Sequence, residues 1–192
     1  QSWLEGRQTK ITGTKLKNIV TLRGNGKKIG FYELIAERLA LPPTEENSMI
    51  RGKRLQEEAI ERFESETGKK VNTDLVIWTR DDNENIAISP DGYIEKDKAG
   101  LEIKCLDSSR HIEALLTKKV PPEYQFQVLQ YFIVNEEMKK LYFCFYDPRL
   151  SVKDFFFYEI DRKDIAEDIA EYYQYQIDTL NEIEQIVNEL SF

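Results

Sequence analysis

The sequence SPDG at residues 89–92, followed by LEIK at residues 101–104, decides the interpretation of this chain. Pro-Asp-Gly favours a tight turn, and Leu-Glu-Ile-Lys fits a strand in which alternate side chains point to the same side. Glu102 and Lys104 therefore share one face of a strand, close to Asp91. Two carboxylates and a lysine at one point are the minimal set of groups for phosphodiester hydrolysis that depends on a divalent cation. The alternative is a simple turn followed by an ordinary, half-exposed strand.

The chemistry of such a site assigns a role to each residue. Asp91 and Glu102 are suitable ligands for Mg²⁺, which prefers oxygen donors, and the backbone carbonyl of Ile103 is a further oxygen. We expect Mn²⁺ to substitute for Mg²⁺. Lys104 either positions or deprotonates the attacking water, or it stabilises the charge that builds on the phosphate. The sequence does not choose between these roles.

The regions around the motif alternate between strand and helix patterns. Hydrophobic runs bounded by turn residues predict strands at residues 71–79, 86–89, 92–95, 101–106, 141–146 and 155–160. Helices are predicted at residues 13–17, 29–41, 47–67 and 122–136, with a long amphipathic helix at the C-terminus. This order predicts an α/β fold in which one mixed sheet lies between helices. We expect a single domain over residues 1–192, with a basic helical part at 1–46, a catalytic core at 47–160 and a C-terminal helix at 161–192.

Two predicted helices offer polar side chains to this site. On the helix before the motif, Gln56 is the only long polar residue of the stripe that we expect to face inward, and a neutral amide binds metals only weakly. Glu57 lies on the neighbouring stripe, which we expect to point outward. On the helix after the motif, Gln127 and Tyr131 share a face, where they are placed to line a groove and order Lys104 or a DNA strand. The alternative for this pair is the rim of an amphipathic helix.

Composition excludes several classes of protein. Of the 192 residues, 41% are hydrophobic and 11% aromatic, which is typical of one folded domain. The apolar runs are too short for a membrane span and the first residues lack a signal-peptide pattern, so we expect no membrane partner. Cys105 and Cys144 lie in apolar strand patterns without CxxC spacing, which indicates a reducing, intracellular setting. Because the chain begins with Gln1 rather than Met, we expect that part of the native N-terminus is missing.

Charge is distributed unevenly along the chain. The net charge of −8 argues against nucleic acid as a partner. However, residues 1–40 carry eight lysines and arginines against three acids, whereas residues 151–192 carry eleven acids against three basic residues. A basic N-terminal arm can bind phosphates while an acidic helix faces solvent. Two solvated surfaces of opposite sign fit the composition equally well, so charge alone does not decide the partner.

Short motifs occur in a fixed order along nearly the whole chain. They are Trp3 and Arg7 before ITGT (11–14), GK (52–53) with Ala59, SPDG (89–92), LEIKC (101–105), SR (109–110), QV (127–128) and YDPR (146–149). This ordered set resembles the YqaJ-like viral recombinase nucleases, the lambda-exonuclease type within the PD-(D/E)XK superfamily. The set is far more specific than any single motif. The resemblance implies a restriction-endonuclease-like domain with a central mixed sheet flanked by helices.

The resemblance also implies an activity. Nucleases of this type degrade one strand of linear double-stranded DNA from its 5′ end in a Mg²⁺-dependent reaction. They leave a 3′ overhang for a phage single-strand annealing protein. The resemblance further implies a homo-oligomer, a toroidal trimer around DNA, in which positive charge need only line the channel. A phage or prophage origin and a location in the bacterial cytoplasm follow from the same resemblance.

The resemblance assigns roles to individual residues of the motifs. Asp91 and Glu102 match the metal ligands, and Lys104 matches the catalytic lysine. Gln127 matches a glutamine near the metals, and its spacing from Tyr131 resembles the QxxxY signature of related exonucleases.

Two further positions concern the DNA end and the early helix. Arg7, with Thr14, matches positions that hold the 5′-phosphate in the family, and a guanidinium suits a terminal phosphate. At the position aligned with Gln56, family members usually carry a glutamate. A natural variant with a weakened metal site, an engineered substitution, or an alignment shifted by one residue would explain this departure. We therefore expect reduced activity, with Gln56 as a weak metal ligand.

Two other functions are compatible with the sequence. A PD-(D/E)XK endonuclease of restriction or repair type would cut circular DNA internally. A non-catalytic DNA-end-binding recombination protein would have lost its metal site, which Gln56 favours mildly and the retained Asp91, Glu102 and Lys104 disfavour. His111 is the only histidine, which excludes a multi-histidine metal site and disfavours a Ser-His-Asp triad. No cofactor other than the divalent cation is expected.

Overall fold

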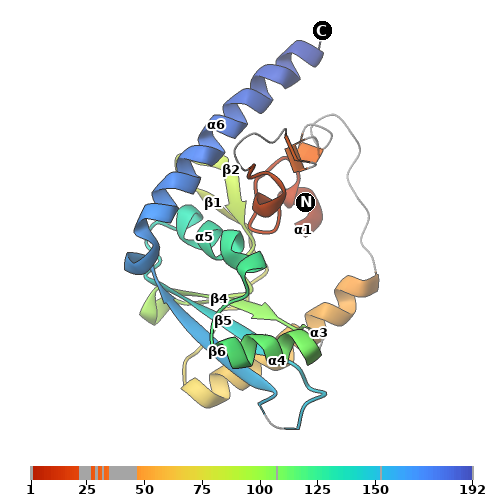
Figure 1. The fold of residues 1–192 in the computed structure, drawn as a ribbon, viewed down its shortest axis with the longest axis vertical. Coiled ribbons are helices and arrows are strands. Elements are labelled where there is room, and N and C mark those ends of the chain that lie inside the picture. The colour runs from red at the N-terminus through yellow and green to blue at the C-terminus, as the bar shows by residue number, and fades with distance from the viewer. Residues whose placement is uncertain are drawn as a thin grey trace.

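A four-stranded mixed sheet forms the centre of the fold (Figure 1). The computed structural model describes residues 2–21, 27–28, 30–31, 33–34, 47–106, 108–151 and 153–191. The strands are β3 (Gly92–Ile94), β4 (Ala99–Lys104), β5 (Lys140–Tyr146) and β6 (Phe155–Asp161), in that spatial order. β4 and β5 pair in parallel, and the two outer pairs are antiparallel. The predicted α/β fold with a central mixed sheet is confirmed.

A separate two-stranded hairpin precedes this sheet. It consists of β1 (Trp78–Arg80) and β2 (Asn83–Ile88). The strand predicted at residues 71–79 is wrong over most of its length, because the segment before β1 makes only one isolated bridge, between Asn72 and Tyr93, in the described part of the chain. The single sheet expected from the sequence is therefore divided into a larger and a smaller one.

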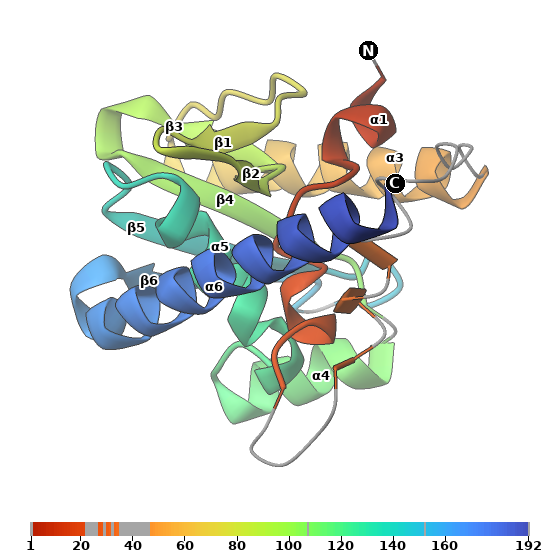
Figure 2. The ribbon, with the colours of Figure 1, turned by 90° about the horizontal axis from the view of Figure 1, so that it is seen from above.

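Helices cover both faces of the larger sheet (Figures 1 and 2). α3 (Asn47–Thr67) packs on one face, whereas α4 (Ser108–Thr117), α5 (Gln125–Val134) and α6 (Ala166–Leu190) lie on the other side. α3 has the predicted bounds. The helix predicted at 122–136 is a 3₁₀ turn (Pro122–Tyr124) followed by α5.

Several short helices differ from the sequence prediction. α1 (Trp3–Arg7) and α4 were not predicted; α1 begins with a capping box in which Ser2 and Glu5 bond each other's backbone amides. The helix predicted at 13–17 is a 3₁₀ turn at Leu16–Asn18. Most of the helix predicted at 29–41 falls outside the described residues.

Alternation along β4 separates the two layers of the core. Leu101 and Ile103 face α3, where they pack with Ala59 and Phe63. Glu102 and Lys104, which alternate with them along the strand, point to the opposite face, toward α5. Because β4 is the second strand of the sheet and is covered on both faces, nearly all of its side chains are buried. A polar side chain on its α5 face is therefore held in a largely apolar interior.

A buried pair of glutamines joins four segments of the chain. Gln130 of α5 donates through Nε2 to the backbone oxygens of Ile11 (2.8 Å) and Ala87 (3.1 Å). Gln130 and Gln176 of α6 also donate to each other's side-chain oxygens, at 2.9 and 2.7 Å. Both glutamines are fully buried. The pair ties the N-terminal segment and β2 to α5 and α6.

The long C-terminal helix packs on the core through its first part. Leu180 and Ile183 are buried, Val187 is partly buried and Leu190 is exposed. The apolar face of this helix therefore packs on the core as far as Val187. None of the helices in the described part of the chain has the length and apolar character needed to cross a membrane. Both cysteines are free thiols, with Cys105 exposed and Cys144 buried.

Candidate active site

The Glu102 carboxylate on the α5 face of β4 is held from three sides. Its Oε1 accepts a hydrogen bond from Gln127 Nε2 at 2.6 Å and forms an ion pair with Lys104 Nζ at 3.1 Å. Its Oε2 accepts from the Tyr131 hydroxyl. Glu102 is only 3% exposed, so these partners replace water almost completely. The expected convergence of Glu102 and Lys104 on one strand face is present in the structure.

Tyr131 connects the turn to β4. Its hydroxyl is 3.0 Å from the backbone oxygen of Leu101 and accepts a hydrogen bond from the Asp91 backbone N–H at 3.2 Å. Tyr131 is fully buried, so the prediction that it lines a groove is wrong. Burial and the nearby Glu102 raise the pKa of Tyr131, so the phenol stays protonated. Its role is to fix the relative positions of Asp91 and Glu102.

Asp91 reaches β4 where that strand has no β3 neighbour. β3 begins at Gly92 opposite Leu101, so the next outward-facing backbone amide of β4 is free to bind a side chain. Asp91 Oδ2 accepts a hydrogen bond from this amide, Ile103 N–H, at 2.7 Å. Burial, and then the charge of Glu102, raise the pKa of Asp91 well above its usual range. Two carboxyl groups are thus placed where a positive charge between them would be stabilising.

Lys104 is held between its carboxylate partner and an aromatic ring. Its ammonium lies 4.7 Å from the centre of the Tyr124 ring, and its side chain is 18% exposed. Burial lowers the pKa of Lys104, but the ion pair and hydrogen bond with Glu102 outweigh this effect, and the net pKa is raised. Lys104 therefore carries a positive charge in the free protein.

These residues fit one divalent cation. Asp91 and Glu102 provide two carboxylates, and a strand residue directs its N–H and C=O to the same side, so the carbonyl of Ile103 faces Asp91. One or two carboxylates with several waters are sufficient for Mg²⁺. Among the described residues, no group of three or more His, Cys, Asp or Glu side chains is arranged to hold a metal. The set of donors therefore has two charged members.

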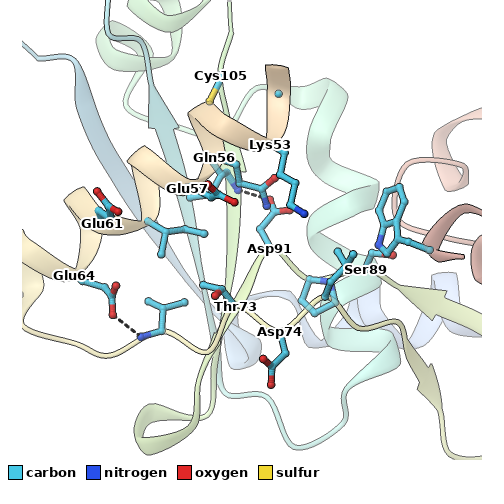
Figure 3. A pocket seen from close by; sticks show the side chains of 17 residues that line it. Lys53, Gln56, Glu57, Glu61, Glu64, Thr73, Asp74, Ser89, Asp91 and Cys105 are labelled. Carbon is cyan, nitrogen blue, oxygen red and sulfur yellow. Dashed lines mark hydrogen bonds between the residues drawn. The ribbon is translucent and has the colours of Figure 1, made fainter. Parts of the chain in front are cut away.

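A cavity of about 980 Å³ opens on the α3 side of Asp91 (Figure 3). Gln56 lines it together with Asp91, so the amide lies where the sequence placed it. Glu57 lines the same cavity, and the prediction that it points away is wrong. The residues that α3 presents are spaced three and four apart and form one broad helical face: Lys53, Gln56, Glu57, Ile60, Glu61 and Glu64.

The N-terminal segment brings Arg7 and Thr14 together. Arg7 donates through a terminal nitrogen to Thr14 Oγ1 at 2.9 Å and to Thr12 Oγ1 at 3.4 Å. Its guanidinium lies 4.5 Å from the centre of the Trp3 ring, which itself lines the cavity. The segment is attached to β2 by backbone hydrogen bonds on both sides of Ile11.

Gly13 lets this segment approach the carboxylate cluster. A Cβ at this position would lie 2.5 Å from Ile88 and 3.0 Å from Gln127, so only glycine fits without a shift of its neighbours. The segment that carries Arg7 therefore packs against Gln127, and Gln127 in turn donates to Glu102.

Two further polar groups, to which the sequence analysis assigned no role, reach the cavity. Within the described structure, Ser89 Oγ and Trp3 Nε1 are buried and lack a hydrogen-bond partner. Both residues line the cavity. Buried donors without partners are uncommon, and a bound ligand is one explanation for them. Both residues belong to the sequence motifs, but only the three-dimensional structure shows that their polar atoms are buried without a partner.

Comparison with known proteins identifies the family. The profile of the YqaJ-like viral recombinase domain matches residues 2–137. The chain belongs to this family. This assignment confirms the resemblance seen in the ordered motifs, and the matched region of the YqaJ-like domain contains every residue placed at the site above.

Solved structures of exonucleases share the fold of this YqaJ-like chain. An alkaline exonuclease, LHK-Exo from Laribacter hongkongensis, superimposes with a TM-score of 0.84 at 28% identity, over 98% of this chain and 94% of that one. The same enzyme in complex with dAMP gives a TM-score of 0.84 at 27% identity, with the same coverage. A phage-related exonuclease from Haemophilus somnus 129PT has a TM-score of 0.66 at 15% identity over 95% and 96% of the two chains, which shows a shared fold. No curated protein sequence matches the chain significantly.

Proposed function

We propose that this YqaJ-like protein is a Mg²⁺-dependent exonuclease that degrades the 5′-ended strand of linear double-stranded DNA. The observation that carries the proposal is the convergence of Asp91, Glu102 and Lys104 around β4. The similarity to alkaline and phage-related exonucleases supports DNA as the substrate class. The dAMP complex of LHK-Exo supports a nucleotide as the unit that the cavity accepts.

Each residue of the centre has a distinct part in the proposed reaction. Asp91, Glu102 and the carbonyl of Ile103 would hold the cation, which when bound supplies Lewis-acid stabilisation of charge on the scissile phosphate. Gln127 and Tyr131 keep the Glu102 carboxylate in one orientation, because both of its oxygens are engaged.

Lys104 acts at the phosphate itself. Its ammonium is already positioned by Glu102 and Tyr124 before substrate arrives. It can therefore orient the attacking water and stabilise the charge of the transition state without reorganisation. The attacking water gives its proton to solvent. Mn²⁺ is expected to replace Mg²⁺ in this arrangement.

The 5′-phosphate of the strand would bind beside Trp3. Arg7 and Thr14 supply a guanidinium and a hydroxyl there, and Ser89 adds a buried hydroxyl without a partner among the described residues. A guanidinium matches phosphate oxygens in geometry and charge. This arrangement would place the terminal phosphate and the scissile phosphate at opposite ends of one nucleotide.

The test is digestion of matched DNA substrates in the presence of Mg²⁺. We expect release of mononucleotides from a linear duplex with 5′-phosphate ends, growth of 3′ overhangs, and no cutting of a covalently closed circle. Internal cuts in the circle would instead identify an endonuclease. Tight binding of duplex ends without any hydrolysis would identify a non-catalytic end-binding protein.

Replacement of Arg7 by methionine should remove the preference for phosphorylated ends. We expect digestion of the 5′-phosphorylated duplex to fall by about 10- to 100-fold, the effect of losing hydrogen bonds to a charged group. Digestion of the 5′-hydroxyl duplex should change little, and the ratio of the two initial rates measures the effect. Lys17→Met, at an exposed lysine of the 3₁₀ turn, is the matched control. An unchanged ratio in Arg7→Met would rule out this phosphate site.

The proposed setting of the enzyme follows from its family. We propose a homo-oligomer, as a ring-shaped trimer, that supplies 3′ overhangs to a phage single-strand annealing protein in the bacterial cytoplasm. A ring would allow an acidic chain of net charge −8 to hold DNA through basic residues in its channel. Light scattering should then give three times the chain mass of 22.6 kDa.

A further inference from the structure

The segment that carries the proposed 5′-phosphate site contacts the carboxylate cluster at one glycine. Gly13 directly precedes Thr14, whose hydroxyl accepts a hydrogen bond from Arg7 at 2.9 Å. A Cβ at Gly13 would lie 3.0 Å from Gln127 Cγ and 3.5 Å from Gln127 Cα. The backbone next to the phosphate-binding hydroxyl therefore packs directly on Gln127.

The backbone on both sides of Gly13 is fixed by hydrogen bonds. The Ile11 N–H donates to the Asn85 carbonyl at 2.8 Å, and the Ile11 carbonyl accepts from the Ala87 N–H at 3.0 Å. After the glycine, the Lys15 N–H donates to the Thr12 carbonyl at 3.2 Å. A segment attached in this way yields less to a neighbouring side chain than a loose loop would, so the contact with Gln127 is a firm one.

Gln127 connects this contact to the candidate cation ligand Glu102. Its side chain is 8% exposed and donates through Nε2 to Glu102 Oε1 at 2.6 Å. The same carboxylate oxygen pairs with Lys104 at 3.1 Å. If the amide turned away, Glu102 would lose a short, buried hydrogen bond and would be drawn toward Lys104. The orientation of Glu102 thus depends on a side chain against which the glycine is packed.

We propose that Gly13 and Gln127 couple recognition of the 5′-phosphate to the orientation of Glu102. A phosphate held by Arg7 and Thr14 bridges α1 and the turn that contains Gly13. The bridge holds this turn against Gln127 and keeps the amide on Glu102. This inference rests on the proposed nuclease function and adds that a phosphorylated end activates the site that cleaves it. Gly13 and Gln127 are positioning residues, because they act through Glu102.

This coupling has to be reciprocal. If a terminal phosphate favours the Glu102 orientation that binds a divalent cation, then the cation favours phosphate binding by the same factor. Coupling between two sites typically changes an affinity by about 5- to 150-fold. The preference for phosphorylated ends should therefore appear in kcat and in cation affinity as well as in KM.

Cation affinity is measured first, by electron paramagnetic resonance of free Mn²⁺. The probe is a duplex with uncharged methylphosphonate linkages at its 5′ end, which resist hydrolysis, and it carries either a 5′-phosphate or a 5′-hydroxyl. Mn²⁺ bound by each duplex alone is subtracted. The native protein should bind Mn²⁺ about fivefold more tightly with the phosphorylated duplex, at the low end of typical coupling.

Two glutamine variants show whether the amide carries the coupling. Gln127→Met keeps most of the side-chain volume but removes the donor to Glu102, so its Mn²⁺ affinity should be the same with both duplexes. Gln125→Met changes an exposed amide on the same helix and should keep the fivefold difference of the native protein. These two measurements do not depend on the folding of any glycine variant.

Gly13→Ala tests the packing contact. The added methyl group crowds Gln127, so kcat on a 5′-phosphorylated linear duplex should fall about tenfold, the effect of weakening one hydrogen bond to a charged group. KM should stay unchanged, because Arg7 and Thr14 are intact. The methyl group would also lie 2.5 Å from Ile88 Cδ1. Ile88→Val removes that atom, so the double variant should keep the kcat defect, whereas Ile88→Val alone should have the native kcat.

The possible outcomes separate the coupling from the proposed function. Equal Mn²⁺ affinity of the native protein with the two duplexes would overturn the coupling, and digestion of linear DNA would at the same time leave the nuclease function intact. A Gly13→Ala defect that Ile88→Val repairs would assign the effect to β2 and would also overturn the role of Gln127. A native protein that neither binds Mn²⁺ nor digests DNA would overturn both proposals.

Discussion

Replacement of Lys104 by methionine is expected to lower the rate of Mg²⁺-dependent DNA digestion by about 10³-fold. This size combines the loss of the group that orients the attacking water with the loss of a charge that stabilises the transition state. Lys104 is held by Glu102 at 3.1 Å and by the Tyr124 ring, so its ammonium is positioned before a substrate binds. Initial rates of mononucleotide release from a 5′-phosphorylated duplex measure the effect.

Two measurements make the Lys104 result specific. Lys96→Met removes an exposed lysine of the turn between β3 and β4 that does not line the cavity, and it should keep the native rate. Far-ultraviolet circular dichroism should show that Lys104→Met remains folded. A folded Lys104→Met protein that digests DNA within threefold of the native rate would refute the assigned role.

Replacement of Arg162 by methionine is expected to give a large loss of stability, of about 3 kcal/mol. Arg162 donates to three backbone oxygens beyond and within the last turn of α5: Met138 (2.7 Å), Phe132 (2.9 Å) and Asn135 (2.6 Å). Carbonyls at a helix C-terminus lack partners within the helix, and a cation there also interacts favourably with the helix dipole. Methionine keeps most of the volume but leaves these oxygens without a donor.

The Arg162 effect is measured by thermal and denaturant unfolding. For a chain of this size, a loss of about 3 kcal/mol corresponds to a decrease in Tm of roughly 6–12 °C. Lys163→Met changes the adjacent, exposed residue and should unfold at the native temperature. If the two variants unfold alike, the cap at α5 contributes little to stability.

Periodicity in the sequence was sufficient to place the parts of the site that lie on regular elements. A two-residue repeat put Glu102 and Lys104 on one face of β4, and a four-residue spacing put Gln127 and Tyr131 on one face of α5. The two pairs meet in the structure, because Lys104, Gln127 and Tyr131 all contact Glu102. The bounds of α3 were predicted for the same reason.

The errors arose where tertiary contacts override local pattern. Residues 71–77 have strand-like composition, but no continuous neighbour pairs with them, so they form only an isolated bridge. Glu57 was placed on an outward stripe because the face of α3 was taken as too narrow; the cavity spans both stripes. The direction of Lys53 depends on the packing of α3 against β4, which periodicity does not specify.

The burial of individual side chains also could not be predicted from the sequence. A tyrosine on an amphipathic helix is usually partly exposed, yet Tyr131 is completely covered and its hydroxyl serves the turn, the strand and Glu102 at once. The same holds for Ser89, whose lack of a partner within the described structure depends on its neighbours in space.

The buried glutamine pair has a consequence for the order in which the described segments of the chain fold. Gln130 reaches its full set of partners only when Ile11, Ala87 and Gln176 are all in place. Gln176 belongs to α6, which is synthesised after the three other segments. The segment carrying Arg7 can pair with β2 through Ile11 without α6, but the mutual hydrogen bonds of Gln130 and Gln176 form only when α6 is in place. Before α6 folds onto the core, we therefore expect this segment to be held less firmly beside Gln127.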